Sequence, residues 1–159
     1  MSGAFAHALE GGYRMDTAAQ TIVVVDGMGG GIGVQLVARI REQLGGAEII
    51  ALGTNGTAVE RMLKAGANRG AAGENAIRVS ARLGAFILGP VGIIVPNSML
   101  GEITPAMAEA ILAAPGERIL LPLRNDHFTL PGTEQMPLTK AIDLAVALLK
   151  ERLLPHDSP

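Results

Sequence analysis

The chain has 159 residues, of which 48% are apolar and 18% charged, which suits a single globular domain and excludes an intrinsically disordered chain. Without cysteine it can form no disulfide and no thiolate metal site, and it is poor in the aromatic residues on which nucleic-acid modules stack bases. The net charge of −2 and the dispersed basic residues also argue against a nucleic-acid partner.

The two ends of the chain differ from its body. Residues 1–19 show no apolar periodicity, so we expect them to form a mobile leader. We expect one domain at 20–153 and a tail at 154–159. The uncharged run at 83–101 contains Pro90 and Pro96, so it fits a buried strand and loop better than a membrane helix. We therefore expect a cytoplasmic protein without a membrane partner.

Strand and helix patterns alternate from residue 21 onward. The run at 21–25 is β-branched throughout, which is typical of a central parallel strand, and the helix after it has Leu36 or Val37, Ile40 and Leu44 on one face. Further strands are predicted at 48–52, 85–88 and 118–123, with short candidates at 68–72 and 128–130 and an extended or turn segment at 92–95.

Two of the remaining helices begin with capping signals. Thr57 and Glu60 read as a capping box, and Thr104 reads as an N-cap before Pro105 at the first helical position. Helices are predicted from Thr57 to about Gly66 and at 74–83, 104–114 and 138–153. The alternation predicts an α/β fold, a single doubly wound domain with a mostly parallel, Rossmann-like sheet of about five strands.

The most specific motif is a glycine-rich loop between the first strand and the first helix. Such glycines allow a tight turn and bring backbone N–H groups close to a phosphate at a helix N-terminus. The spacing Gly27-x-x-x-Gly31-x-Gly33 is similar to that of short-chain dehydrogenases, and the absence of a nearby lysine excludes a Walker A loop. We predict that this loop binds a phosphate or nucleotide, the alternative being a turn that binds nothing; its residues are Asp26, Gly27, Met28, Gly29, Gly30, Gly31, Ile32 and Gly33.

Polar residues beside this loop have two interpretations each. Asp26 would repel a bare phosphate unless it caps the N–H groups of the loop, which we expect, or holds Mg²⁺. The second strand ends in Thr54 and Asn55, where a nicotinamide site usually has an acidic residue for the ribose. Thr54 and Asn55 could donate to a ribose hydroxyl or a 2′-phosphate, or could only shape the turn.

Five further residues are considered for the substrate side or for catalysis. Glu74 opens a helix, where the helix dipole alone favours an acid, and Asn97 and Ser98 could recognise a ligand or cap their own loop. Asp126 and His127 could form a proton-carrying pair or a solvated loop pair. Neither a Tyr-x-x-x-Lys pair nor a Gly-x-Ser-x-Gly elbow is present, and no metal site is expected, so whether the protein is an enzyme stays open.

Five motifs in order resemble one family, the small bacterial proteins catalogued as domain of unknown function 3842. They begin at Val25 with the glycine loop and continue through 48–55, 62–68, 73–77 and 97–105. The resemblance extends from about Thr21 to about Leu149 and implies a Rossmann-like protein without an assigned activity. The stretch 124–127 departs from the family pattern, which weakens the case for His127.

These observations lead to two hypotheses for the function. The first is a nucleotide- or dinucleotide-binding protein with NAD or NADP as the expected cofactor. Such a protein could be an NAD(P)-dependent oxidoreductase of a small molecule, because a cofactor can supply reactivity that the side chains lack. The second is a non-catalytic sensor of a nucleotide or small ligand, or a subunit of a homo-oligomer, since low charge and many small apolar residues favour burial between chains.

Overall fold

The computed structural model describes residues 20–123 and 127–154, so the leader predicted at 1–19, Asp126 and the tail beyond Leu154 lie outside the described residues. The described strands are β1 (Thr21–Asp26), β2 (Glu48–Gly53), β3 (Arg69–Ala72), β4 (Phe86–Pro90) and β5 (Glu117–Leu121). The described helices are α2 (Gly31–Gln43), α3 (Gly56–Ala65), α4 (Glu74–Ser80), α5 (Pro105–Ala113) and α6 (Leu138–Leu153), with short 3₁₀ helices η1 (Ala81–Leu83) and η2 (Val91–Ile94).

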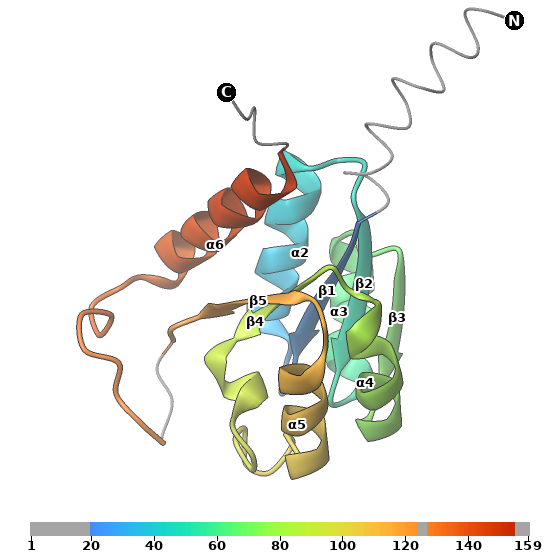
Figure 1. Cartoon of the computed structure of the whole chain (residues 1–159), viewed down its shortest axis with the longest axis vertical. Coiled ribbons are helices and arrows are strands. Elements are labelled where there is room, and N and C mark those ends of the chain that lie inside the picture. Colours follow the sequence, from blue (N-terminus) through green and yellow to red (C-terminus); the bar gives the residue numbers. More distant parts are fainter. Residues whose placement is uncertain (1–19, 124–126, 155–159) are drawn as a thin grey trace, which may run out of the picture.

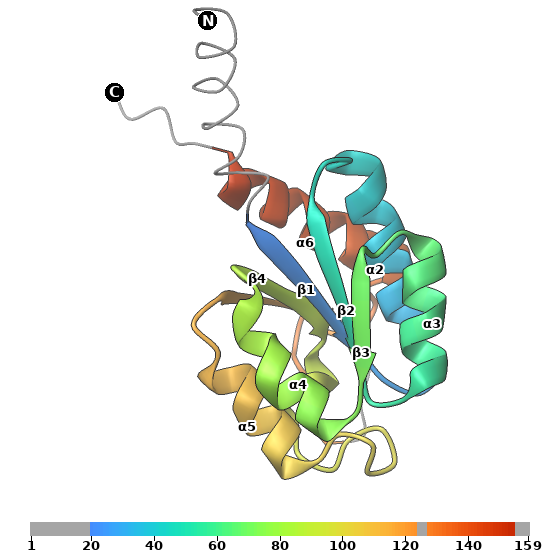
Figure 2. The same cartoon turned by 90° about the vertical axis from the view of Figure 1, so that its right-hand side faces the viewer.

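The strands form one parallel sheet in the order β3-β2-β1-β4-β5, with helices on both faces (Figure 1). Because side chains alternate along a strand, β1 supplies both cores. Ile22 and Val24 pack with residues of α2, α3 and α6, whereas Val23 and Val25 pack with residues of α4 and α5. Figure 2 shows these two groups of helices on opposite faces of the sheet. The predicted doubly wound α/β fold with five strands is therefore confirmed.

Some local predictions differ from the structure. The capping box at Thr57 is wrong, because α3 begins one residue earlier and its N-cap is Asn55, whose side chain accepts a hydrogen bond from the Ala58 N–H at 2.9 Å. Residues 128–130 form no strand and are exposed. Of the two alternatives for 92–95, the turn fits better than the extended segment, because most of these residues lie in η2. The Thr104 cap is confirmed, since its hydroxyl accepts from the Met107 N–H at 3.2 Å.

The topology determines where a site can form. From β1 the chain moves outward to β2 and β3 on one side, and then returns to β4 and β5 on the other. The connections that follow β1 and β4 therefore diverge at the carboxyl edge of the sheet, and in open α/β sheets ligands bind in the crevice at this switch point. In the described part of the chain, no helix is long and apolar enough to cross a membrane.

Candidate functional site

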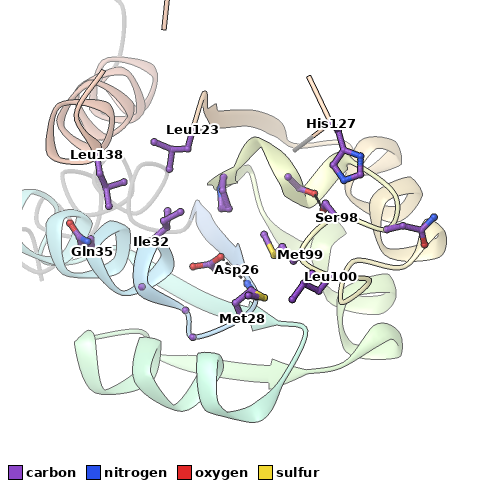
Figure 3. A pocket seen from close by; sticks show the side chains of 17 residues that line it. Asp26, Met28, Ile32, Gln35, Ser98, Met99, Leu100, Leu123, His127 and Leu138 are labelled. Carbon is purple, nitrogen blue, oxygen red and sulfur yellow. Dashed lines mark hydrogen bonds between the residues drawn. The ribbon is translucent and has the colours of Figure 1, made fainter. Parts of the chain in front are cut away.

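A pocket of about 650 Å³ lies at this switch point (Figure 3). Its volume falls within the usual range for sites that bind small molecules. The lining comes from the end of β1 and the start of α2, from the segment that follows β4, and from residues near β5 and the start of α6. It consists of Asp26, Gly27, Met28, Gly29, Gly30, Gly31, Ile32, Gln35, Pro90, Gly92, Asn97, Ser98, Met99, Leu100, Leu123, His127 and Leu138.

The walls of this pocket carry unusual backbone geometry. Among the described residues, the non-glycine residues with positive φ all line the pocket: Met28, Asn97, Met99 and Leu100, with φ between 52° and 65°. A left-handed backbone costs about 1–2 kcal/mol for a residue with a side chain. Strain of this kind persists where the surrounding structure enforces it, and it clusters at binding and catalytic sites.

Asp26 caps the glycine loop, as the sequence predicts. Its Oδ1 accepts the Gly27 N–H at 2.8 Å and its Oδ2 accepts the Gly33 N–H at 2.7 Å. Helix α2 has no side-chain cap at its own N-cap residue, the left-handed Gly30, so the carboxyl group at the end of β1 takes that role. Part of the hydrogen-bonding capacity of the loop is therefore used by the protein itself.

Burial raises the pKa of Asp26 above its ordinary value. Desolvation is the largest cause, and the negative charge of Glu102 adds to it. The amides of Gly33, Gly27 and Ile32 oppose the shift, because they stabilise the charged form. A buried carboxyl group with a raised pKa at the base of a pocket is a common feature of functional sites.

Two amides of the loop remain unused. The N–H groups of Gly29 and Gly31 make no hydrogen bond to another described residue, whereas the Met28 N–H donates to Glu102 and the Gly30 N–H to the Gly27 carbonyl. A Cβ at Gly31 would meet nothing within 4 Å, so this residue borders open space at the start of α2. Unpaired amides at the positive end of a helix form a place where an anion can bind.

A cation lies next to these amides. The guanidinium group of Arg61, on α3, donates to the Gly29 carbonyl, and its Nη1 would be 3.3 Å from a Cβ built on Gly29. Arg61 was not among the residues predicted from the sequence. Arg61 lies in the middle of α3, and nothing in the local sequence indicates its contact with the glycine loop.

Glu102 closes the opposite side of the loop. Its Oε1 accepts three hydrogen bonds: from the Met28 N–H at 3.1 Å, the Thr54 hydroxyl at 2.6 Å and the Asn55 Nδ2 at 2.9 Å. The Thr54 hydroxyl is the main reason why the pKa of Glu102 is lowered, with Asn55 and Met28 contributing. Glu102 was not among the predicted site residues, because nothing in the local sequence indicates a contact with the end of β2.

The remaining predicted residues are distributed unequally. The pocket brings together the residues from Asp26 to Ile32 with Asn97, Ser98 and His127, while Gly33, Thr54, Asn55 and Glu74 lie outside its lining. Glu74 accepts from the Thr104 hydroxyl at 2.9 Å and so joins the start of α4 to that of α5. The buried Ser98 hydroxyl donates to the Gly92 carbonyl, which is the loop-capping role considered above.

Sheet order and pocket position define the class of protein to which this chain belongs. A parallel sheet in the order β3-β2-β1-β4-β5, with a glycine-rich loop and a pocket at its switch point, is that of a Rossmann-like α/β protein. The family model described as Domain of unknown function (DUF3842) matches residues 21–154, and the chain belongs to this family. Comparisons with curated proteins and with solved structures gave no match.

Proposed function

We propose that the protein binds a small nucleotide in the switch-point pocket. One phosphate of the ligand accepts hydrogen bonds from the Gly29 and Gly31 amides at the start of α2, with Arg61 beside it. The nucleoside lies against the apolar side chains of Ile32, Leu123 and Leu138. The observation that carries this proposal is the pair of unused amides on the border of a pocket of about 650 Å³.

The charges around the pocket favour few phosphates over many. Asp26 lies in the lining and Glu102 lies close enough to raise the pKa of Asp26, whereas no lysine or arginine is among the described lining residues. A single phosphate therefore suits the described state better than a triphosphate does, because each added charge is repelled by both carboxylates. Protonation of Asp26 would favour the bound anion.

If the nucleotide were NAD or NADP, the protein could be an oxidoreductase. A dinucleotide needs donors for its second phosphate and its adenosine ribose at the ends of β1 and β2. In the described state, three donors there are bonded to Glu102. A dinucleotide would therefore require the Glu102 side chain to move, whereas a mononucleotide would not.

Thermal unfolding with a panel of AMP, ATP, FMN, NAD and NADP in phosphate-free buffer tests the proposal. A ligand at 100 times its Kd stabilises the folded state by about 2.7 kcal/mol, which gives a clear rise in Tm. We expect AMP or FMN to give the largest rise. If no nucleotide raises the Tm at millimolar concentration, the proposed function is wrong.

A further inference from the structure

Glu102 makes contacts of the kind that a bound anion makes. One carboxylate oxygen accepts hydrogen bonds from a backbone amide, a hydroxyl and a side-chain amide that come from two different loops. The residues that donate them are Met28, Thr54 and Asn55, all at the carboxyl ends of β1 and β2. Backbone amides, hydroxyls and carboxamides are groups that proteins use to bind phosphate oxygens.

We propose that Met28, Thr54 and Asn55 form a second phosphate site, which the carboxylate of Glu102 occupies until a diphosphate ligand displaces it. This inference rests on the proposed function, in which the first phosphate binds at Gly29 and Gly31. It adds the class of ligand that fills both sites, a nucleoside diphosphate or the diphosphate of a dinucleotide.

The two sites are close enough for one diphosphate. Met28 and Gly29 are consecutive residues, so their Cα atoms are about 3.8 Å apart. Met28 donates to Glu102, while the next amide, that of Gly29, has no partner among the described residues. Two linked phosphate groups can therefore reach from the first site to the second without a change in the glycine loop.

Glu102 can leave without unfolding its segment. The Oε2 atom makes no hydrogen bond to a described residue, so only Oε1 holds the side chain in place. The backbone of the segment is held separately, by the bond from Asn97 N–H to the Ile103 carbonyl at 2.7 Å and by the Ser98 hydroxyl on Gly92. A change of side-chain rotamer is therefore sufficient to free the three donors.

The neighbouring Met99 and Leu100 also belong to this closed state. A Cβ at Gly27 would lie 2.7 Å from the Met99 sulfur, so this side chain packs directly on the glycine loop. Leu100 is 94% exposed, although its backbone is held at a positive φ. Both residues would cover a diphosphate from the solvent side once Glu102 has turned away, so the segment 97–102 would act as a lid.

The test compares the affinities for AMP and ADP in two variants at 150 mM salt. Glu102→Gln keeps the shape of the side chain and removes the charge that competes with phosphate, and Glu109→Gln on α5 is the control with the same change of charge. We expect calorimetry to show that Glu102→Gln binds ADP at least tenfold more tightly than the wild type, with AMP changed less than threefold. The control should leave both affinities unchanged.

An unchanged ratio of ADP to AMP affinity in Glu102→Gln would overturn the proposal. Weaker binding of ADP would also overturn it, because Glu102 would then be a group that accepts hydrogen bonds from the ligand.

Inorganic pyrophosphate separates this inference from the proposed function. In Glu102→Gln it should shift the NMR signals of the Met28 amide and the Asn55 side-chain amide. If these signals move while no nucleotide binds any variant, the proposed function fails and the second phosphate site stands. If AMP binds the wild type but pyrophosphate leaves both signals unmoved, the second site is refuted and the proposed function remains.

Discussion

Gly30 and Gly31 are adjacent in the loop but have opposite structural requirements. Gly30 has a φ of 72°, and a Cβ there would lie 2.9 Å from the Ala58 Cα, which belongs to the backbone of α3. Gly31 begins α2, and a Cβ there would enter open space. The first glycine is thus required by the fold, while the second leaves open space at the proposed phosphate site.

This difference predicts opposite effects of alanine at the two positions. Gly30→Ala should lower the free energy of unfolding by about 1–2 kcal/mol from the left-handed backbone, and further from the contact with Ala58. Gly31→Ala should raise it by about 0.4–1 kcal/mol, because alanine restricts the unfolded chain. Urea unfolding measures both free energies. Equal changes in the two variants would contradict the different structural requirements of Gly30 and Gly31.

Glutamate at residue 31 should separate binding from folding. Gly31→Glu has space for its side chain, and a carboxylate in the first turn of a helix is favoured by the helix dipole. We expect a Tm equal to or above that of the wild type, with loss of the nucleotide-induced rise in Tm. Persistent nucleotide binding by this variant would show that the phosphate lies elsewhere.

The raised pKa of Asp26 predicts a pH dependence of stability. A carboxyl group whose pKa is higher in the folded state contributes stability that is complete at acid pH and is lost as the pH rises through the folded pKa. The unfolding free energy of the wild type, minus that of Asp26→Asn, should therefore fall as the pH rises from 4 to 7. If this difference grows between pH 4 and pH 7, the hydrogen bonds from the loop amides lower the pKa of Asp26 by more than burial raises it.

At the scale of elements, apolar patterns predicted most of the fold. The helix predicted at 138–153 is α6 with its observed bounds, and its residues Ile142, Val146, Leu149 and Leu153 all pack in the core. The N-cap of α3 was predicted wrongly, because Thr57 and Asn55 are both good capping residues. The helix begins soon after β2 ends at Gly53, so Asn55 is the residue at the capping position. The run at 128–130 has β-forming residues, but no sheet edge pairs with it.

Arg41 joins the ends of two helices in a way that the sequence did not indicate. Its guanidinium donates to the Gly66 carbonyl after α3 at 2.9 Å, to the Gly45 and Ala47 carbonyls after α2 at 2.7 and 2.8 Å, and to the Asn68 side chain at 2.7 Å. These bonds give partners to carbonyl groups in the turns that follow α2 and α3, where the backbone leaves the helices. The planar group of an arginine can make them all at once.

Replacement of Arg41 should therefore cost more than replacement of Arg39 on the same helix. Arg41→Gln should lower the unfolding free energy by about 1.5–3 kcal/mol, as expected for hydrogen bonds to a charged group. Within the described part of the chain, Arg39 forms ion pairs at the surface with Glu42 and Asp143, so Arg39→Gln should cost less than about 1 kcal/mol. Comparable losses in urea unfolding would contradict the role given to Arg41.

At the scale of the whole molecule, the fold was predictable and the state of the site was not. Alternating strands and helices predict a doubly wound sheet, and such a sheet places the glycine loop at a switch point. The contacts of Glu102 join residues that are 74, 48 and 47 positions apart in the chain. No periodicity or local motif records such contacts, so the sequence could not show which amides of the loop the protein itself uses.

The most direct test of the central claim is an NMR titration of the ¹⁵N-labelled wild-type protein with AMP. The claim is that unused amides at the start of α2 bind the phosphate of a nucleotide. We predict saturable shifts that are largest for the Gly29 and Gly31 amides, with smaller shifts at Ile32 and Leu138. The proposed phosphate site would be contradicted if the largest shifts lay outside the switch-point pocket, or if millimolar AMP caused no shifts.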